Sequence, residues 1–454
     1  MSAVVKKLET YTPTSEIFDQ WYNNPNVAFL DSSKEDELGK YSIIGISPYL
    51  EVEEREGILY INGKEKTGSM ESYLKEYLRE NQQKNSTQLP IISGAIGFFS
   101  YDYGRRFEQI GTRHPLQSSI PEARFVFYDN FIVEDKTKKE VYLVANGKTK
   151  EAKESIAELE GFITNIGKDK KEILLFNDAK ETIELQKSVT KEQYLEALEK
   201  VRDYIRKGHI YVMNLTQQIQ IQSKRSPYEV FKRLQRNNPA PFSAYLNYGE
   251  YEIISASPER FLKVKDGKIE TRPIKGTRKR GNTKEEDDAL KKELAHSQKD
   301  KSELLMIVDL ERNDLNRICI PGSVKVTELF QVETYETVFH LVSNVVGELQ
   351  KDIDMIDVLN AMFPGGSITG APKVRAMEII DELEAQRRGI YTGILGYLSL
   401  NGDCDFNIVI RTALYQNEQY QIGVGGGITY ESDMEFEYEE TLQKAKALIE
   451  AISM

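Results

Sequence analysis

A chain of 454 residues exceeds the size that one hydrophobic core usually stabilises, so we expect two domains or one large composite domain. Hydrophobic residues make up 40% and charged residues 29%, and the net charge of -12 argues against a general binder of nucleic acid or anionic membranes. The first residues lack a signal-peptide pattern, and no apolar run is long enough to span a bilayer. The 2 cysteines are too few for a disulfide framework or a structural zinc site, so we expect a cytosolic protein.

Short extended segments dominate the first part of the chain, from residue 27 to about residue 165. Alternating, aromatic and β-branched residues between Gly and Asn turns predict strands of a largely antiparallel sheet. These strands are expected at 27–33, 41–54, 57–63, 92–104, 125–135 and 140–147. The charged, weakly patterned residues 167–188 predict a connecting segment between an amino-terminal region, 1–166, and a second region, 189–454.

Helical and extended patterns mix in the second region. Thr190 and Gln193 form a possible capping box, which predicts a helix that stops at Gly208. The apolar run 304–308 predicts a helix that is buried on every side. Further helices are expected at 228–235, at 374–387 and from about 437, with strands at 210–222, 242–248, 251–257, 260–272, 324–346, 393–400 and 406–415. Mixed clusters of this kind favour an α+β fold over a doubly wound sheet.

A run of basic residues without an acid covers residues 271–284, although the whole chain is acidic. A solvated loop is the simplest interpretation, and nucleic acid is disfavoured because acids follow directly at 285–288. Lys275 differs from its basic neighbours because Pro273, Ile274 and Gly276 flank it. This apolar flank, together with the like charges of Arg272 and Arg278, predicts a lowered pKa for Lys275, as a nucleophilic lysine requires.

Further groups are candidates for chemistry. Glu303 adjoins the apolar run, so it either needs a cation or a metal or lies at a helix start where the dipole favours it. Glu437, Glu440 and Lys444 share one helical face, which is otherwise a solvated one. The glycine-containing loops 364–373 and 423–429 offer free backbone amides to a carboxylate or phosphate. A hairpin would bring Glu259 close to Lys275.

From about residue 190 to the end, the chain resembles the chorismate-utilising enzymes. The strings that carry this resemblance are NLTQ, NPAPFSAYL, SASPERF, RPIKGT, ELLMIVDLERNDL, HLVSNV, FPGGSITGAPK, GILGYLSL, IVIRTA, GGGIT and EYEETLQKAKAL. LDSS at 30–33 and GAIGFFSYDYG at 94–104 are similar to the family's amino-terminal region. The resemblance implies a composite α+β fold of two stacked antiparallel sheets wrapped by helices, with the two halves interleaved.

The resemblance also implies a reaction. Members that make aminodeoxychorismate carry lysine in PIKGT, whereas anthranilate synthases carry alanine, so Lys275 implies amination of chorismate with the enolpyruvyl ether kept. Glu259 would be the general acid, and Thr277 and His340 match further catalytic positions. The matching substrate-binding positions are Tyr391, Arg411, Gly425, Gly426, Gly427 and Lys444.

The implied cofactor is Mg²⁺, with Glu303 and Glu440 as its ligands. Ammonia would come from a glutamine amidotransferase subunit, because the chain has no nucleophile-elbow cysteine. Cys319 is expected to be a structural thiol and Cys404 a turn residue. Two alternatives stay open: an anthranilate synthase component I, and a non-catalytic sensor of chorismate or tryptophan.

Overall fold

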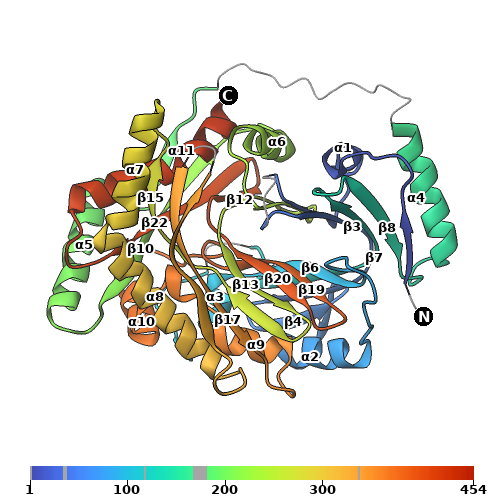
Figure 1. Ribbon diagram of the computed structural model, residues 1–454, viewed down its shortest axis with the longest axis horizontal. Helices are drawn as coiled ribbons and strands as arrows, with labels where there is room; N and C mark the ends of the chain where they lie inside the picture. The colour runs from blue at the N-terminus through green and yellow to red at the C-terminus, as the bar shows by residue number, and fades with distance from the viewer. Residues whose placement is uncertain (1–2, 34–37, 117–118, 167–180, 336–337) are drawn as a thin grey trace.

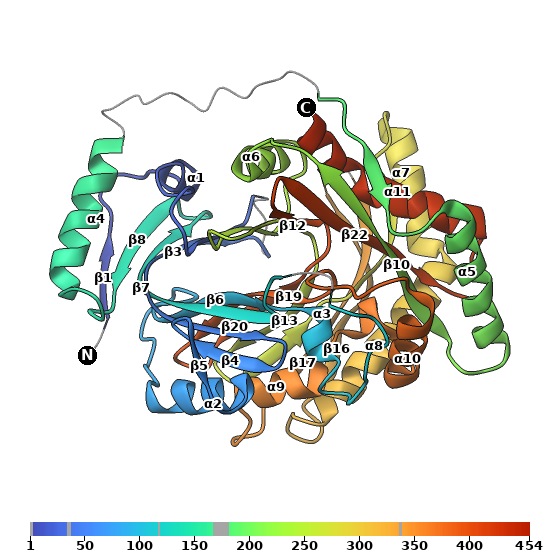
Figure 2. The same ribbon diagram turned by 180° about the vertical axis from the view of Figure 1, so that it is seen from behind.

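Two antiparallel β-layers wrapped by helices make up the part of the chain that the computed structural model describes, which is residues 3–33, 38–116, 119–166, 181–335 and 338–454. Figure 1 and the reverse view in Figure 2 both place α1 (Thr14–Phe18) and α4 (Ala152–Ile166) at one end of the molecule. The helices α5 (Lys191–Arg206), α7 (Lys284–His296) and α11 (Met434–Ser453) lie at the opposite end.

Two long strands, β3 (Tyr41–Arg55) and β7 (Ala123–Asp135), belong to both layers. The first part of β3 pairs with β2 (Val27–Asp31), and its last part pairs with β4 (Ile58–Ile61). Between these parts Ser47 has a φ of 58° and the register with β7 shifts after Pro48. A local break of this kind bends a strand, so one strand pair can pass from one layer into the other.

The first layer continues from β2 as far as β10. Its further strands, in the order of their pairing, are β11 (Phe242–Asn247), β12 (Glu252–Ser257), β21 (Thr412–Gln416), β22 (Gln419–Ile428) and β10 (Val212–Gln222). β9 (Leu185–Lys187) and β18 (Gly370–Ala371) add to β10, while β8 (Glu140–Ala145) and β1 (Val4–Lys7) extend the layer beyond β7.

The second layer starts from β7 and ends in a three-way pairing around β17. Its strands, in the order of their pairing, are β6 (Gly94–Phe99), β19 (Ile394–Ser399), β20 (Cys404–Ile408), β13 (Arg260–Lys265), β14 (Lys268–Thr271) and β17 (Val338–Glu348). β15 (Ile274–Lys279) and β16 (Lys325–Thr334) both pair with β17, and β5 (Lys64–Lys66) pairs with β4. The β2–β11 and β6–β19 pairings interleave the two halves of the sequence, as the resemblance implied.

Helices cover the outer faces of both layers, and apolar side chains fill the space between the layers. Phe98, Leu246, Leu395 and Leu414 are among the buried residues of this inner cluster. α1, α4, α6 (Pro227–Asn237) and α11 pack with the first layer, and α7 and α8 (Gln298–Asn316) pack over β15, β16 and β17. The remaining helices are α2 (Met70–Glu80), α3 (Tyr101–Gly104), α9 (Met355–Met362), α10 (Lys373–Leu383) and the 3₁₀ turn Gly366–Ile368.

Several sequence-based expectations are confirmed and others need correction. The capping box at Thr190 is present and starts α5. The helix expected to be buried on every side is instead amphipathic, because Leu305 is 43% exposed. The expected helix at 374–387 ends earlier, at Leu383, and Cys404 is a buried strand residue, not a turn residue.

The pattern analysis did not anticipate α2, α4, α7 and α9. Residues 167–180 of the expected connecting segment lie outside the described residues. Within the described ranges, no helix is long and apolar enough to cross a membrane.

Candidate active site

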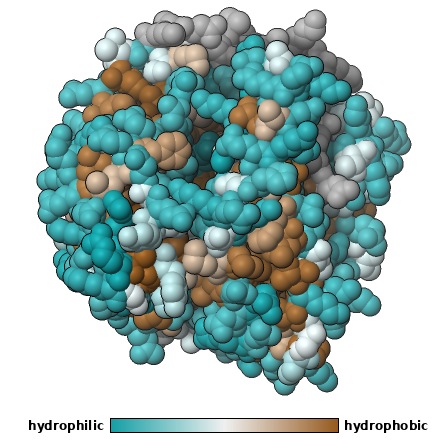
Figure 3. Space-filling model, turned by 60° about the vertical axis from the view of Figure 1, so that its left-hand side comes forward, coloured by the Kyte–Doolittle hydropathy of each residue, from teal (hydrophilic) through white to brown (hydrophobic). Residues whose placement is uncertain are grey.

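A cavity of about 510 Å³ opens where β15, β22, α8 and α11 meet, and we call it the Lys275 cavity. Every site residue expected from the sequence lines it: Glu259, Lys275, Thr277, Glu303, His340, Tyr391, Arg411, Gly425, Gly426, Gly427, Glu440 and Lys444. Seen from the end that carries α5, α7 and α11, the surface is hollowed among mainly hydrophilic side chains (Figure 3). α7 and α11 contribute Glu293 and Phe436 to the cavity lining.

The amine of Lys275 projects from β15 into this cavity. Its Nζ lies 3.1 Å from Glu303 Oε1 and donates a hydrogen bond to the carbonyl oxygen of Ser367, also at 3.1 Å. Burial alone would lower the pKa of Lys275, but the carboxylates of Glu303, Glu259 and Glu440 outweigh it, so the pKa is raised. The expectation of a lowered pKa is therefore wrong for the protein without ligands.

The arginines that were expected to lower this pKa have other partners. Arg278 binds Glu293 at 2.8 Å and Asp300 at 3.1 Å, and Arg272 binds Glu328 at 2.7 Å. Their charges are thus compensated locally. The sequence shows that these arginines are near Lys275 along the chain, but it does not show the acids that α7, α8 and β16 bring to them.

Glu259 lies directly before β13 and is only 6% exposed. Burial raises the pKa of its carboxyl group even though Lys275 nearby acts in the opposite direction. Among the described residues, neither Glu259 Oε1 nor the hydroxyl of Ser367 has a hydrogen-bond partner. A carboxyl group whose pKa is raised in this way is suited to donate a proton to a bound molecule.

Glu303 and Glu440 approach two adjacent glycines of β22 from different helices. A Cβ atom on Gly427 would lie 2.2 Å from Glu303 Oε1, and one on Gly426 would lie 3.1 Å from Glu440 Oε2. Glu303 lies beyond the first turn of α8, so the alternative that it stands at the helix start, where the dipole favours it, is wrong. The glycines are therefore required by the space that the carboxylates occupy.

These carboxylates have cationic partners inside the cavity. Glu303 pairs with Lys275, and Glu440 binds Lys444 at 3.0 Å, while Lys444 also donates to the carbonyl oxygen of Gly425 at 2.9 Å. No group of three or more His, Cys, Asp or Glu side chains in the described part of the chain is arranged to hold a metal ion alone. Two carboxylates fit a Mg²⁺ ion whose remaining ligands are substrate and water oxygens.

Arg411 and Tyr391 form the wall on the side of β22. Arg411 makes no ion pair in the described residues, and burial lowers the pKa of its guanidinium. The ring of Tyr391 lies against Gly423, where a Cβ atom would come within 2.0 Å of the ring. A guanidinium without an ionic partner in such a wall fits a ligand carboxylate, which it can bind with two parallel hydrogen bonds.

Thr277 and His340 are cross-strand neighbours in the β15–β17 pair, with 2.9 Å between Thr277 Oγ1 and His340 Nδ1. The sequence analysis missed other lining residues. Lys299 lies 3.4 Å from Glu437 Oε1 at the mouth of the cavity, beside the exposed Phe436. Glu437 had been placed on the correct helical face, but nothing in the sequence pattern pointed to Lys299.

The loop 364–373 contributes differently from what was expected. It was expected to offer amides to an anion, but at Lys275 it presents the carbonyl oxygen of Ser367, a hydrogen-bond acceptor. The reason is the 3₁₀ turn Gly366–Ile368, which directs this carbonyl group toward the lysine. At Ser367 the loop therefore serves as an acceptor for the Lys275 ammonium group.

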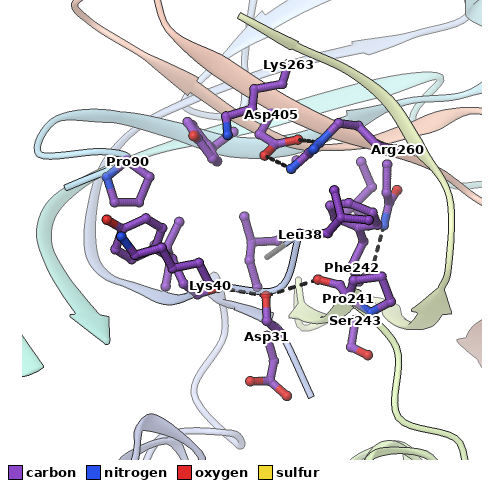
Figure 4. Close-up of a pocket in the computed structure, with 18 of the residues that line it drawn as sticks. Asp31, Leu38, Lys40, Pro90, Pro241, Phe242, Ser243, Arg260, Lys263 and Asp405 are labelled. Carbon is purple, nitrogen blue, oxygen red and sulfur yellow. Dashed lines mark hydrogen bonds and ion pairs between the residues drawn. The ribbon is translucent and has the colours of Figure 1, made fainter. Parts of the chain in front are cut away.

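A second, smaller cavity of about 140 Å³ lies between the layers, and we call it the Arg260 cavity. Asp31 and Ser32 of the LDSS string line it together with Phe242 and Ser243. Figure 4 shows Arg260 and Asp405 paired across one side, whereas the carboxylate of Asp31 points away from the open space. The LDSS string therefore contributes to the Arg260 cavity, whereas the site residues expected from the sequence line the Lys275 cavity.

Comparisons with known proteins agree with this geometry. The model of the family described as chorismate binding enzyme matches residues 26–450. Anthranilate synthase component 1 of Acetivibrio thermocellus is 37% identical over 449 residues, which cover 95% of this chain and 91% of the relative. Aminodeoxychorismate synthase component 1 of Bacillus subtilis (strain 168) is 38% identical over 425 residues, covering 92% and 90%.

A solved structure extends the similarity to the fold. The crystal structure of anthranilate synthase component I from Streptococcus pneumoniae TIGR4 superimposes with a TM-score of 0.81 at 32% identity, covering 91% of this chain and 93% of the other. The expected fold class is thereby confirmed, while the relatives divide between two activities. The chain belongs to the chorismate binding enzyme family and is an enzyme that uses chorismate.

Proposed function

We propose that the protein is component I of an aminodeoxychorismate synthase, which converts chorismate and ammonia into 4-amino-4-deoxychorismate for 4-aminobenzoate and folate synthesis. The observation that carries this choice is the amine of Lys275, which points into the cavity 3.1 Å from Glu303 and close to the acid Glu259. Anthranilate synthases resemble this chain elsewhere but carry alanine at that position. A cavity built around a lysine amine supports covalent chemistry that an alanine cannot provide.

The proposed reaction exchanges the 4-hydroxyl group of chorismate for an amino group in two displacements. Lys275, as the free amine, forms a bond to C2 while the two conjugated ring double bonds shift and the C4–O bond breaks. Glu259 donates its proton to the departing oxygen, which leaves as water. Ammonia then attacks C4, both double bonds return, and the C2–N bond to Lys275 breaks. The surplus proton on the new amine returns to Glu259, so that both residues are restored.

The other cavity residues have binding roles in this proposal. Arg411, Tyr391 and Lys444 would hold the carboxylates of chorismate, and Thr277 with His340 would position the ring end that faces β15. Glu303 and Glu440 would hold Mg²⁺, and the ion would supply positive charge to compensate the substrate carboxylate at that end of the cavity.

Lys275 reacts only as the neutral amine, and its raised pKa in the ligand-free protein opposes this. The carboxylate of Glu303, which contributes to that raised pKa, is also a proposed metal ligand. Removal of Mg²⁺ by a chelator should therefore abolish turnover, and replenishment should restore it. Full activity in excess chelator would contradict the assignment of Glu303 and Glu440.

Ammonia would be supplied by a separate glutamine amidotransferase subunit, and relatives of both activities carry the designation component 1. The purified chain should use ammonium at alkaline pH but not glutamine, because free ammonia is the nucleophile. Addition of the amidotransferase should restore the use of glutamine at neutral pH. Glutamine hydrolysis by the purified chain alone would show this division of labour to be wrong.

Product identification tests the proposal directly. Chorismate, ammonium and Mg²⁺ should yield 4-amino-4-deoxychorismate, which keeps the enolpyruvyl group. Anthranilate and an equal amount of released pyruvate are the outcome expected of the alternative, an anthranilate synthase. Without ammonia, mass spectrometry should find chorismate less one water on the peptide that contains Lys275, and Lys275→Ala should abolish this adduct. Wild-type turnover by Lys275→Ala without any trapped adduct would contradict the covalent mechanism.

A further inference from the structure

Glu311 is a buried carboxyl group of α8 that the proposed reaction does not use. It is 7% exposed and lies two helical turns beyond Glu303 on the same helix. Its Oε2 atom lies 3.0 Å from the hydroxyl of Thr271, the last residue of β14. Thr271 is itself buried and stands four positions before Lys275 in the chain. The contact therefore joins the helix of Glu303 to the segment that leads to Lys275.

The number of hydrogens at this contact decides which residue donates. A threonine hydroxyl has one hydrogen to donate, and Thr271 Oγ1 lies 2.8 Å from the carbonyl oxygen of Phe261, which can only accept. The single hydrogen of Thr271 is therefore used by Phe261. The remaining contact, between Thr271 Oγ1 and Glu311 Oε2, needs a hydrogen from Glu311. Glu311 satisfies it only if it is a protonated carboxylic acid.

The charged neighbours of Glu311 support the same protonation state. Lys373, on α10, binds Asp314 at 2.6 Å and the carbonyl oxygen of Met362 at 3.2 Å, so it is engaged elsewhere. No ion pair of Glu311 occurs in the described residues. Burial raises the pKa of Glu311 well above its ordinary value, and the nearby acids Glu259 and Asp314 act in the same direction.

We propose that Glu311 remains a neutral acid in the working enzyme and is a positioning residue, which ties α8 to the hairpin that presents Glu259 and Lys275. Thr271 connects the two parts, because its hydroxyl accepts a hydrogen bond from Glu311 and donates one to the carbonyl oxygen of Phe261 on β13. The bond fixes the distance between the helix of Glu303 and the strand of Lys275. Because Glu311 is neutral, no second negative charge lies near Glu259 when Glu259 gives up its proton.

The proposal concerns the site of the proposed function, but it does not depend on which amine product is formed. Turnover is therefore followed as ammonia-dependent consumption of chorismate, whichever product appears. Glu311→Gln is the matched conservative variant, because its amide N–H replaces the acid O–H as donor to Thr271. Glu311→Leu has a similar volume but no donor, and Thr271→Val removes the receiving hydroxyl.

We expect Glu311→Gln to retain kcat within about twofold with an unchanged pH profile, since a neutral donor replaces a neutral donor. Glu311→Leu should lower kcat about tenfold, with a smaller change in KM, as the loss of one buried hydrogen bond implies. Thr271→Val should behave alike, and the double variant should be no worse than either single one. Infrared difference spectra of wild type against Glu311→Gln at neutral pH should contain the carbonyl stretch of a protonated acid.

Three outcomes would overturn the proposal. A shifted pH profile in Glu311→Gln, or a loss of kcat as large as that of Glu311→Leu, would mean that Glu311 acts through its charge. Wild-type kcat in Glu311→Leu would mean that the contact positions nothing. A difference spectrum without the protonated-acid band would mean that Glu311 is ionised. The spectrum and the Gln variant decide the question even if the Leu variant does not fold.

Discussion

The two cavities of this protein differ in how their buried charges are paired. In the Arg260 cavity, Arg260 binds Asp405 at 2.9 Å and Glu270 at 2.7 Å, and Asp31 binds Lys136 at 2.9 Å. In the Lys275 cavity, Arg411 has no ionic partner among the described residues, and Glu259 Oε1 accepts no hydrogen bond there. Arg260 and Asp31 are thus paired within the protein, whereas Arg411 and Glu259 Oε1 are not.

The difference has an energetic meaning. A buried polar group without a partner lowers the free energy of unfolding. A bound molecule that supplies the missing partner removes this destabilisation. Substitutions of Glu259 or Arg411 in the Lys275 cavity should therefore reduce activity while leaving the stability unchanged or raising it. Substitutions in the Arg260 cavity should do the reverse. Substitutions of Glu259, Arg411 and Asp405 test this contrast, and the largest effect is expected for Glu259.

Glu259→Gln should lower kcat by about 10²–10⁴-fold, because an amide cannot donate the proton that the leaving oxygen needs. The same variant should be more stable than wild type at neutral pH. The folded-state pKa of Glu259 is raised, so its stabilising contribution is complete below the unfolded pKa and is lost as pH rises through the folded one. Initial rates and urea unfolding at acidic and neutral pH measure both effects. Equal stability loss at all pH values would contradict the unpaired state of Glu259.

Arg411→Gln should raise the KM for chorismate by about 10- to 100-fold, which corresponds to the loss of a charge-assisted hydrogen bond to a carboxylate. Its free energy of unfolding without ligand should stay within about 1 kcal/mol of wild type or rise, because no ion pair is broken. Steady-state kinetics and urea denaturation provide the measurements. A clear destabilisation with normal KM would place Arg411 among the structural charges.

Asp405→Asn should lower the free energy of unfolding by about 1–3 kcal/mol, because it leaves buried Arg260 with Glu270 as its remaining carboxylate. Its kcat with saturating chorismate should match that of wild type. The midpoint of urea unfolding reports the first quantity and initial rates report the second. Loss of activity without loss of stability would show that the two cavities are not separable in this way.

The sequence predicted which residues form the site better than it predicted the pKa of Lys275. Spacing on α11 placed Glu437, Glu440 and Lys444 on one face, and the β13–β14 hairpin brought Glu259 to Lys275, because both patterns are local. The raised pKa of Lys275 was not predictable in this way. It results from the carboxylates of Glu303, Glu259 and Glu440, of which Glu303 on α8 and Glu440 on α11 are distant from Lys275 in the sequence.

The fold class followed from the mixed strand and helix patterns, but individual helices did not. α7 is highly charged and carries few apolar residues, so its helical periodicity is weak. α2 has apolar residues at helical spacing, namely Met70, Tyr73, Leu74, Tyr77 and Leu78, and the pattern analysis overlooked them. The apolar run of α8 looked buried throughout because the sequence does not reveal that Leu305 faces outward. Such errors arise wherever tertiary packing, not the local pattern, decides which face of an element is covered.

The strand pairs β2–β11 and β6–β19 have a consequence for how the protein is made. During synthesis, β2 and β6 leave the ribosome long before their partners, so their edges wait unpaired while the rest of the chain is translated. Unpaired edges are sites of association between nascent chains. A truncated transcript that ends near residue 166 should therefore give an aggregating product, and supply of residues 181–454 in trans should rescue its solubility.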